Sequence, residues 1–558
     1  MFKYMIIFIR AVTKVTLPVK SGLRIIERIA GRKTQNMTIS DMVSRNARKY
    51  PNQLAFVELC PSKNFRKEIT WHEFDDRINR VANALLKMGL RKGDKVLHLM
   101  MNSVPWLETY FGVIRAGGWI IPLNYRFIGS QIKYCADVAE PKFFILDDNF
   151  TDTVMPVCSE MKTIKDYIFI GKNVPQGMHE YEQLIAGASS APVNIDLPED
   201  DGCAIYFTSG TTGAPKATVL THRNMVATAM HENHAHRENS RDNFLLLQPL
   251  YHTGGKMHWF GSLIVGGRCT IITGGERISA QLILETISRE KITEIMLLVP
   301  WIQDLVTALD KGELKLDNFD VSSLKLMHSG AQPIPPTLIR HWKGWFLHAG
   351  YETHYGLTES AGPCVHLLPE NIERVGALGW PMLELDARIV DDKDNDVPFG
   401  VVGELILKGD NIMKEYYKNP EQTAQALKGG WLHTGDMAKM EPDGCLTFVD
   451  RKKDLVITGG ENIYPWEIEE LFHAHPKVAD AALIGIPDER LGEVALAIIQ
   501  PKANVAITEQ EFKEYYEPRL PKYQWPRAVI FDRIPRNPTG KIEKPQIRNK
   551  YRNYKWQK

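Results

Sequence analysis

Several features that would assign a protein to a specialised class are missing from this 558-residue chain. Its seven cysteines are scattered, odd in number and without a CxxC pair, which argues against a disulfide framework or a zinc site and for reduced thiols in a cytosolic protein. The net charge of +1 gives no reason to expect nucleic-acid binding. We see no internal repeat and no low-complexity stretch, so repeat and fibrous architectures are excluded.

Long apolar runs are also missing. Met5–Ile9 is only five residues long, whereas a bilayer span needs roughly 20, and no secretory cleavage pattern follows it. Residues 1–33 nevertheless carry eight basic side chains against one acidic one, a charge of +7. Lys20, Arg24 and Arg28 recur every four residues beside apolar side chains. The segment is therefore either a basic amphipathic helix on an anionic membrane surface or an extension packed against the protein's own body, and we favour the extension.

The composition is otherwise that of a globular protein, with 44% hydrophobic and 24% charged residues. The length is too great for one compact core and predicts two or more domains. Trp71–Met88 has the apolar spacing of a helix, and the runs Lys95–Leu99 and Phe143–Leu146 look like strands. Alternation of this kind predicts an α/β architecture with largely parallel sheets. Asp391–Gly400 is a polar turn cluster between two strand-like runs, which predicts a hairpin.

One loop carries the strongest chemical signal. Cys203–Phe207 suits a buried strand, and Thr208–Lys216 follows it with hydroxyl residues, two glycines, a proline and a lysine. Glycines let backbone N–H groups approach an anion, and the hydroxyls and the ammonium add donors, so the loop is suited to grip a polyphosphate. It is not a Walker A loop, because no glycine directly precedes Lys216 and Ala217 follows it. An ordinary turn is the alternative interpretation of this segment alone.

Further motifs follow in a fixed order along the chain. They are His354–Glu359 (HYGLTE), Trp431–Asp436 (WLHTGD), Asp450–Asp454 (DRKKD), Gly459–Ile463 (GGENI) and Asn537–Lys541 (NPTGK). Together with the Thr208–Lys216 loop, these segments resemble the adenylate-forming (AMP-binding) superfamily of acyl-CoA synthetases, peptide-synthetase adenylation domains and firefly luciferase. The resemblance runs from about Asp41 to about Arg548.

The resemblance implies an α/β fold with two parts of unequal size. A large N-terminal domain of several subdomains, with mainly parallel sheets, would cover residues 37–450, and a small mobile α+β C-terminal domain would cover 454–558. Residues 451–453 would form the hinge, with Lys453 at the family's hinge position. The basic amphipathic extension, residues 1–36, precedes the first recognisable family element.

The activity implied is that of an AMP-forming acyl-CoA synthetase, which activates a carboxylic acid as acyl-AMP with release of pyrophosphate and then transfers the acyl group to CoA. ATP, CoA and the acid are the expected partners, and Mg²⁺ is the expected cofactor. The family's phosphate loop corresponds to Thr208, Ser209, Gly210, Thr211, Thr212, Gly213 and Lys216. Other expected nucleotide contacts are Gly330, Ala331, Gln332, His354, Tyr355, Gly356, Thr358, Glu359, Asp436, Arg451 and Lys541.

Each expected role follows from the family's motif and from the chemistry of the side chain. Tyr355 would offer a flat face to adenine, and Asp436 would accept hydrogen bonds from both ribose hydroxyls. Glu359 and Thr211 would serve the magnesium ion. Lys541 would neutralise the acid and the α-phosphate as they approach one another. The catalytic residues are thus expected to be Lys541, His252, Thr208 and Glu359.

The second half-reaction is expected to use another face of the small domain. Gly459 and Gly460 would form the backbone wall of a passage for pantetheine, because paired glycines allow a narrow chain to pass close by. Asn462 would lie near that passage. Rotation of the small domain would bring this segment in and withdraw Lys541, so the two steps would use opposite faces of one domain.

The acid itself is only loosely indicated. The acyl pocket is expected to be lined by His252, Thr253, Gly254, Trp259, Trp301, Ala361 and Gly362. Small residues and tryptophans describe a roomy apolar pocket without a cation for a second carboxylate, which favours a cyclic or medium-chain acid. The nearby histidines His231, His234 and His236 have no evident acidic or cysteine partner at ligand spacing, so we expect a polar helix end there and no metal.

Two other functions remain as alternatives. An adenylation enzyme that loads a carrier protein would share the first step, but no carrier domain is apparent in the sequence. A non-catalytic nucleotide-binding scaffold is disfavoured because the charged residues of every motif are present, namely Lys216, Glu359, Asp436, Arg451 and Lys541. We expect a cytoplasmic protein, peripheral at a membrane only if residues 1–36 bind there.

Overall fold

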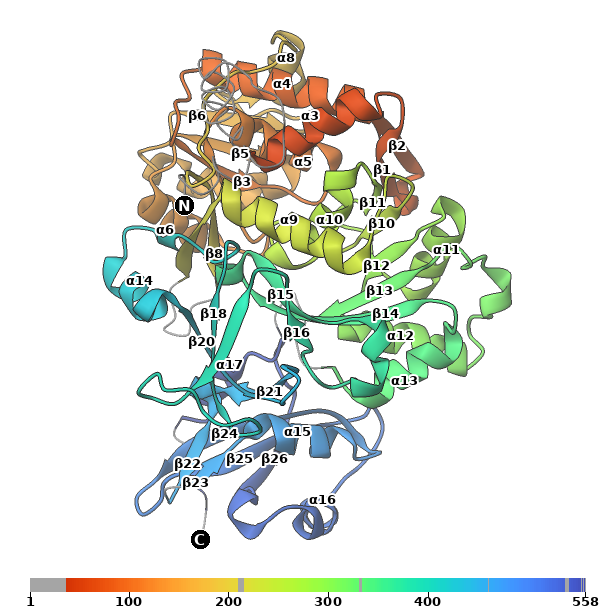
Figure 1. Ribbon diagram of the computed structural model, residues 1–558, viewed down its shortest axis with the longest axis vertical. Coiled ribbons are helices and arrows are strands. Elements are labelled where there is room, and N and C mark those ends of the chain that lie inside the picture. Colours follow the sequence, from red (N-terminus) through yellow and green to blue (C-terminus); the bar gives the residue numbers. More distant parts are fainter. Residues whose placement is uncertain are drawn as a thin grey trace, which may run out of the picture.

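The computed structural model describes residues 37–208, 215–330, 334–459, 461–536, 541–552, 554 and 556. The predicted basic segment, residues 1–36, lies outside the described residues, so neither interpretation of it is tested. A large domain is followed by a small one at the opposite end of the long axis (Figure 1). Among the described helices, none is long and apolar enough to cross a bilayer.

The first large sheet carries the predicted phosphate loop and has eight strands. The five strand pairings between β8 and β7 are parallel, whereas β9 pairs antiparallel with both of its neighbours, β8 and β19. In spatial order the strands are β19 (Glu415–Tyr416), β9 (Lys216–Thr221), β8 (Gly202–Thr208), β4 (Trp119–Pro122), β3 (Lys95–Leu99), β5 (Phe143–Asp147), β6 (Asp166–Ile170) and β7 (His179–Glu180).

The second large sheet has nine strands and is parallel from β1 to β14, with antiparallel strands at both edges. In spatial order these are β16 (Trp380–Pro381), β15 (Gly362–Leu367), β14 (Gly350–Leu357), β13 (Leu326–Gly330), β12 (Glu294–Met296), β10 (Asn243–Leu246), β11 (Arg268–Ile272), β1 (Leu54–Cys60) and β2 (Phe65–Thr70). The expected α/β architecture with largely parallel sheets is confirmed.

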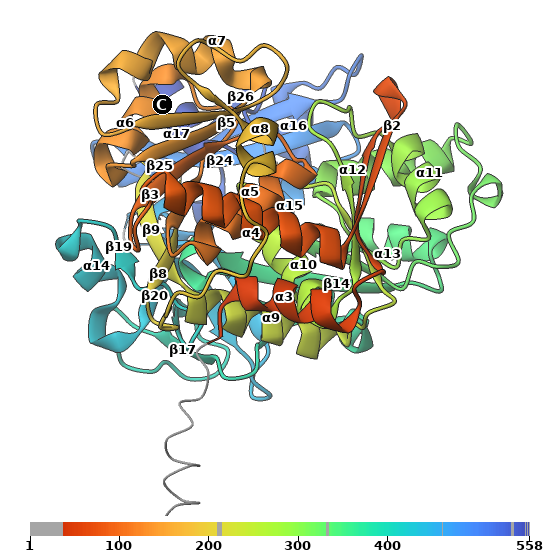
Figure 2. The same ribbon diagram turned by 90° about the horizontal axis from the view of Figure 1, so that it is seen from above.

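Helices lie between the two large sheets and share one apolar core with both (Figures 1 and 2). The core residues come from α3 (Ile39–Lys49), α4 (Trp71–Lys87), α5 (Val104–Arg115), α9 (His222–His236) and α10 (Thr253–Val265). The other helices of the large domain are α6 (Gly129–Ala139), α7 (Thr151–Val154), α8 (Tyr181–Ala186), α11 (Ala280–Glu290), α12 (Val299–Asp310), α13 (Pro336–Trp345) and α14 (Pro420–Ala426).

Local sequence explains where α4 begins and which face it buries. Thr70 and Glu73 form a capping box, in which the Thr70 hydroxyl accepts the Glu73 N–H and the Glu73 carboxylate accepts the Thr70 N–H. Phe74, Ile78 and Leu85, spaced at three to four residues or multiples of that, are buried. The predicted helix is therefore present and ends one residue before the predicted Met88.

A smaller antiparallel sheet connects the large domain to the small one. It contains β17 (Asp386–Val390), β18 (Gly403–Lys408), β20 (Leu432–Met440) and β21 (Leu446–Arg451). β17 and β18 pair antiparallel from Asp386↔Lys408 to Val390↔Glu404, so the hairpin predicted around Asp391–Gly400 is confirmed. The 3₁₀ turn Lys452–Asp454 follows β21 and contains Lys453, whose role as a hinge stays a prediction.

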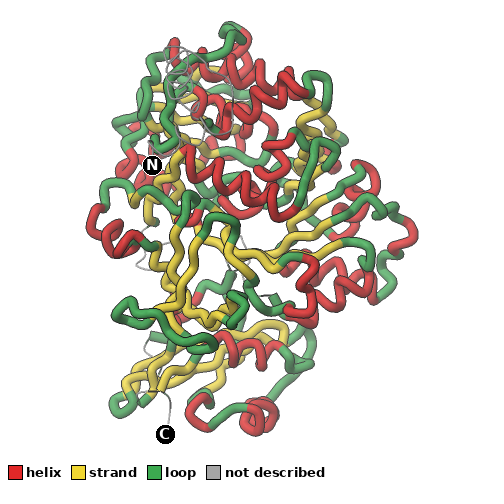
Figure 3. The backbone as a smooth tube through the Cα atoms, in the orientation of Figure 1, coloured by secondary structure: helices red, strands yellow, loops and turns green. Residues whose placement is uncertain are grey.

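The small domain is one sheet covered by helices on both faces (Figure 3). Its strands are β22 (Val456–Thr458), β23 (Glu461–Ile463), β24 (Val478–Asp488), β25 (Gly492–Pro501) and β26 (Ala528–Phe531). Helices α15 (Pro465–His473) and α16 (Glu509–Tyr516) contribute to the core on one face, and α17 (Lys544–Lys550) contributes to the core on the other. A large domain with mainly parallel sheets and a small α+β domain are thus observed, as predicted.

Candidate functional site

The phosphate loop is anchored at both ends by strand pairing. Thr208 closes β8 and Lys216 opens β9, and the two residues face each other as the last pair of an antiparallel register. Ser209, Gly210, Thr211, Thr212 and Gly213 lie outside the described residues, as do Ala331, Gln332 and Gly460, so the roles expected for them stay predictions. The structure therefore fixes where the loop begins and ends, at Thr208 and Lys216.

A tyrosine and two charged residues from β14, β20 and β21 form a compact group. The Tyr355 hydroxyl donates a hydrogen bond to Asp436 Oδ2 at 2.6 Å, and Arg451 Nε lies 3.4 Å from Asp436 Oδ1. Asp436 and Arg451 are paired across β20 and β21, so the backbone register holds them together. The Asp436 N–H is itself bonded to Thr434 Oγ1 at 3.1 Å. Three of the predicted nucleotide contacts therefore converge.

The predicted magnesium residue Glu359 has a partner that the sequence interpretation missed. The Tyr416 hydroxyl donates to Glu359 Oε1 at 2.8 Å, and the Lys216 ammonium lies 4.9 Å from the centre of the Tyr416 ring. Tyr416 thus connects the predicted cation ligand to the lysine at the end of the phosphate loop. The aromatic pair Tyr416-Tyr417 was visible in the sequence, but only the antiparallel pairing of Tyr416 with Thr218 reveals where it lies.

Lys541 reaches this group from the small domain. Desolvation is the main reason that the pKa of Lys541 falls to about 8, and the positive charge of Arg451 acts in the same direction. The carboxylates of Asp436 and Glu359 oppose that fall. Lys541 is therefore buried within electrostatic reach of Arg451, Asp436 and Glu359, three residues with predicted roles in binding ATP and Mg²⁺.

His252 caps the helix that borders the predicted acyl pocket. It precedes α10, and its Nδ1 accepts the N–H of Gly254 at 3.1 Å. Burial, followed by the positive charge of Lys541, lowers the pKa of His252 to about 4. A neutral ring whose Nδ1 is an acceptor carries its proton on Nε2, so His252 presents an N–H donor. Its neighbour Thr253 is buried as the first residue of α10, whereas Trp301 is half-buried.

Two of the predicted site residues have side chains that the structure turns into the protein interior. His354 alternates with Tyr355 along β14, so it points to the opposite face of the strand, where its ring lies 3.9 Å from that of His258. The buried His354 side chain is therefore turned away from Asp436. Trp259 is fully buried and packs against Phe56 at 5.5 Å between ring centres, so it belongs to the core and does not form a pocket wall.

The small residues also have structural explanations that differ from those predicted. A Cβ on Gly356 would lie 2.0 Å from the Gly362 carbonyl oxygen, so this glycine allows two strands to approach each other. A Cβ on Gly362, whose φ is +102°, would lie 3.0 Å from Met257 Cβ. Ala361 is fully buried. Gly254 is less crowded, since the nearest atom to a Cβ there is His252 Nδ1 at 3.3 Å. Of these small residues, Gly254 alone remains a good candidate for making room for a substrate.

Glycine is needed for packing at Gly330 as well. A Cβ there would lie 2.3 Å from His354 Nε2. Thr358, by contrast, is half-buried at the start of the 3₁₀ turn Thr358–Ser360 that leads into Glu359. The structure therefore keeps Thr358 beside the magnesium residue, and it explains Gly330 by the histidine behind it.

The predicted CoA residues lie elsewhere on the small domain. Gly459 has a φ of +60° in the turn between β22 and β23, and Asn462 is exposed on β23. Both strands lie at the outer end of the molecule (Figure 1). The structure therefore does not bring these residues together with Asp436 and Lys541, in keeping with a second step that uses another face of the domain.

One contact crosses the predicted hinge. Asp450, at the end of the large domain, accepts the N–H of Trp466 in α15 at 2.7 Å. Burial is the main cause that raises the pKa of Asp450 to about 6. Beyond the hinge, Arg548 pairs with Asp454 at 2.6 Å. The Asp450–Trp466 hydrogen bond joins the large domain to the small one, whereas the Asp454–Arg548 pair lies within the small domain.

Two family models match the chain. The model described as AMP-binding enzyme matches residues 43–417, and the model described as AMP-binding enzyme C-terminal domain matches residues 467–541. The first match alone covers more than half of the chain. The two matches also fall on the large and the small domain respectively.

Relatives and solved structures extend over most of the chain. The 4-hydroxybutyrate–CoA ligase 2 of Metallosphaera sedula is 30% identical over 502 residues, covering 86% of this chain and 89% of the relative. The feruloyl-CoA synthase of an Amycolatopsis species is 31% identical over 486 residues, covering 87% and 94%. The crystal structure of the anthranilate CoA ligase AuaEII in complex with anthranoyl-AMP is similar with a TM-score of 0.84 at 25% identity, covering 94% and 99%.

Proposed function

The chain belongs to the AMP-binding enzyme family and is an AMP-forming acid–thiol ligase, and from this premise we propose that it converts a cyclic (aromatic or alicyclic) or medium-chain carboxylic acid into its CoA thioester through an acyl-AMP. The observation that supports the assignment most directly is the position of Lys541, a small-domain residue buried within electrostatic reach of Arg451, Asp436 and Glu359 of the large domain; burial, followed by Arg451, lowers the pKa of Lys541 to about 8. ATP, CoA and the acid are the substrates.

In the first step an oxygen of the carboxylate attacks the α-phosphorus of ATP, and the bond to the β-phosphate oxygen breaks to release pyrophosphate. Negative charge accumulates around the phosphorus, and the Lys541 ammonium is the group that can neutralise both reactants there. Asp436, held by Tyr355 at 2.6 Å, is positioned to accept the ribose hydroxyls. Lys216 and the backbone of the loop would hold the leaving phosphates.

Glu359 suits the magnesium ion that the family uses. One oxygen is bonded to Tyr416, and the other, Oε2, accepts no hydrogen bond from the described residues. A hard cation prefers oxygen ligands and needs few from the protein when phosphate oxygens complete its shell. The ion would neutralise the charge of the departing pyrophosphate, and Thr211, outside the described residues, would add a hydroxyl nearby.

In the second step the thiol sulfur of CoA attacks the acyl carbonyl and expels AMP, and the thiol proton goes to solvent or to a neighbouring base. We assign the passage for pantetheine to the turn at Gly459 and Gly460, with Asn462 beside it. Because Gly459 and Asn462 lie on the outer β22–β23 hairpin, the small domain must rotate about Lys453 for this step.

The proposed class of acid rests on the pocket's chemistry. His252 offers one neutral N–H donor, which can orient a carboxylate without binding a second one strongly. The lysine on α10, Lys256, is fully buried, and its ammonium lies 5.4, 4.3 and 4.5 Å from the ring centres of Trp106, Tyr110 and Tyr206, so it is not offered to a substrate. Relatives named for ferulate, anthranilate and 4-hydroxybutyrate show that similar chains accept monocarboxylic acids of different sizes.

A two-part assay tests the proposal. Exchange of labelled pyrophosphate into ATP is measured with a panel of aromatic, alicyclic, medium-chain, long-chain and dicarboxylic acids, and thioester formation is then measured with CoA. Exchange and thioester with cyclic or medium-chain acids are expected. Exchange without thioester would favour an enzyme that loads a carrier protein, whereas no exchange with any acid would favour a non-catalytic scaffold. A preference for dicarboxylic acids would contradict the pocket assignment.

Residues 1–36 have two possible roles that one experiment separates. If their charge of +7 within residues 1–33 binds an anionic surface, the full chain sediments with anionic vesicles and salt releases it. If they pack on the protein, a chain starting at Met37 is less stable and the full chain ignores the vesicles. Unchanged catalytic constants after truncation would accompany the first outcome.

A further inference from the structure

Five histidines from five different elements meet in the interior of the large domain. They come from the end of α9, from α10 and from the adjacent strands β13, β14 and β15. We call them, with two glutamates, the histidine cluster: His236, His258, His328, His354, His366, Glu232 and Glu352. Their side chains are between 0% and 4% exposed. The cluster lies on the face of β14 opposite Tyr355 and is separate from the reaction proposed above.

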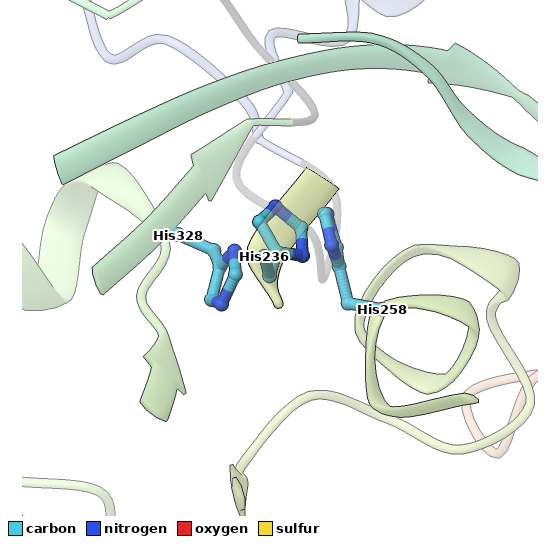
Figure 4. Close-up of side chains that lie close together, drawn as sticks. All are labelled: His236, His258 and His328. Atoms are coloured by element: carbon cyan, nitrogen blue, oxygen red, sulfur yellow. The ribbon is translucent and has the colours of Figure 1, made fainter. Parts of the chain in front are cut away.

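Three of these histidines surround one point. The ring centre of His236 lies 4.5 Å from that of His328 and 5.9 Å from that of His258, and the latter two are 5.0 Å apart. Figure 4 shows the three side chains extending toward one another from different parts of the fold. One ring nitrogen from each lies within 4.8 Å of the other two. Nitrogen ligands of a tetrahedral zinc ion lie about 3.4 Å apart, so small ring rotations would bring all three onto one ion.

Several ring nitrogens of these residues lack a hydrogen-bond partner in the described part of the chain. Among the described residues, neither nitrogen of His236 or of His258 forms a hydrogen bond, although Glu232 Oε2 contacts His258 Nδ1. Nε2 of His328 also lacks a hydrogen bond, with Glu294 Oε2 3.9 Å away. Burying polar nitrogens without partners is unfavourable, and proteins rarely leave several of them together. A bound cation would supply the missing partner for all three rings at once.

A carboxylate lies beside the same point. Glu232 stands one helical turn before His236 on α9, with Oε2 3.6 Å from His236 Nδ1, and it also contacts His258 Nδ1. This acidic partner at ligand spacing was overlooked in the sequence, where only the three neighbouring histidines were weighed. His236 is the last residue of the predicted polar helix end, but its side chain is only 1% exposed.

We propose that His236, His258 and His328, with Glu232 as the fourth ligand, form a structural site for one divalent first-row transition ion. Zn²⁺ fits this set best, because imidazole and carboxylate ligands in a closed tetrahedral arrangement are typical of it. Cations that prefer six oxygen ligands, such as Mg²⁺, are disfavoured by three imidazoles.

Glu352 lies on the opposite side of the His328 ring from the proposed ion and supports the assignment. It accepts a hydrogen bond from His328 Nδ1 at 3.1 Å, so Nε2 is the nitrogen left to bind an ion, with Glu294 Oε2 3.9 Å from it. A carboxylate behind a histidine is the usual second partner of a metal-binding imidazole. The other oxygen of Glu352 accepts from His366 Nδ1 at 2.5 Å. The ion would thus join α9 and α10 to β13, the strand that ends at Gly330.

Metal content of the full-length chain tests this proposal. The protein is purified through a tag without histidine, loaded with Zn²⁺, dialysed against a weak chelator and analysed by plasma mass spectrometry. We expect one tightly held equivalent per chain in the wild type and a loss of affinity of about tenfold or more in His236→Gln. His234→Gln is the matched control, because His234 is exposed on the same helix, and it should retain the ion.

Each other outcome would overturn the site. A wild type that holds no Zn²⁺, Co²⁺ or Ni²⁺ after dialysis would show that the cluster is a network of ion pairs alone. Retention in His236→Gln together with loss in His234→Gln would show adventitious binding at the surface. If His236→Gln does not fold, X-ray absorption of the Co²⁺-loaded wild type decides: three imidazoles per ion support the site, and fewer contradict it. None of these readouts depends on ligase activity.

Discussion

The small domain has two functional regions whose surroundings differ sharply. Lys541 lies among the charges of the large domain, where burial holds its pKa at about 8, whereas Gly459 and Asn462 lie on a hairpin at the outer end of the molecule. One region is enclosed and the other is open to solvent. Under the proposed mechanism, a single orientation of the domain serves only one of the two half-reactions, and the orientation seen here, in which Asp450 accepts the Trp466 N–H, is the one suited to adenylation.

Replacing the enclosed residue should have the largest effect. Lys541→Ala removes the charge that faces the developing negative charge, which should cost about 3–4 kcal/mol and slow pyrophosphate exchange by roughly 10²–10³-fold. Thioester formation from supplied acyl-AMP should be nearly unchanged, because Lys541 leaves the site in that step. Lys550→Ala, on the exposed side of α17, is the control. Equal loss in both half-reactions would contradict the difference between the two regions.

A substitution in the open region should have the reverse effect. Gly460→Leu places a bulky side chain beside Gly459, at a position outside the described residues, and should block CoA while pyrophosphate exchange continues. Thioester formation should fall by on the order of tenfold or more, since a passage too narrow for pantetheine disfavours every productive complex. Gly460→Ala should give an intermediate value. If exchange disappears together with thioester formation, the passage is wrongly assigned or the domain is misfolded.

The pH dependence of the first step should sharpen the contrast further. Only the ammonium form of Lys541 is active, so kcat/KM for adenylation should be constant below about pH 8 and fall about tenfold per unit above it. Thioester formation from acyl-AMP should lack this decline. Lys541→Arg keeps its charge at high pH and should abolish the decline even if its rate is lower. A decline that persists in Lys541→Arg would assign the titration to another group.

The smallest effect is expected within the large domain alone. Tyr416→Phe removes the hydrogen bond to Glu359 but keeps the ring beneath Lys216, and it should weaken ATP–Mg²⁺ use by about 1 kcal/mol, roughly fivefold in kcat/KM. Tyr417→Phe is the control, because the neighbouring ring contacts Trp119 instead. Steady-state kinetics at varied Mg²⁺ measure the effect. Equal responses of the two variants would remove Tyr416 from the site.

Elements with a strong local pattern could be predicted well from the sequence. The strand Lys95–Leu99 was predicted with its observed bounds, because a short apolar run between polar turns has few other interpretations. The helix from Trp71 was predicted because its buried residues recur at helical spacing. The order of the motifs also placed Asp436, Arg451 and Lys541 in one site, and the structure brings them together.

His354 and Trp259, whose side chains the structure turns into the interior, show what the sequence could not give, which is the direction of a side chain on its element. His354 precedes Tyr355 in the motif, but adjacent residues of a strand face opposite sides, so only one of them can face the nucleotide. Trp259 looked like a pocket wall, yet it lies on the side of α10 that packs against Phe56. In both cases the prediction considered the type of residue but not the direction of its side chain.

Other features could not be predicted because they depend on distant pairings. Tyr416 reaches Glu359 through the pairing of β19 with β9, across more than fifty residues of sequence. The histidine cluster joins residues from α9 to β15, and no local spacing shows that His236 and His328 meet. The single local signal there is Glu232, one turn before His236.

The capping role of His252 restricts how the preference for an acid can change. The imidazole that can orient the acid also holds the first turn of α10 through the Gly254 N–H. A lineage that adapts to a new acid by replacing this residue would loosen the helix at the same moment, unless Ser, Thr, Asn or Asp takes over the cap. Divergence toward new substrates should therefore proceed more readily through neighbours such as Gly254 and Trp301, with His252 changing late and only to another capping residue.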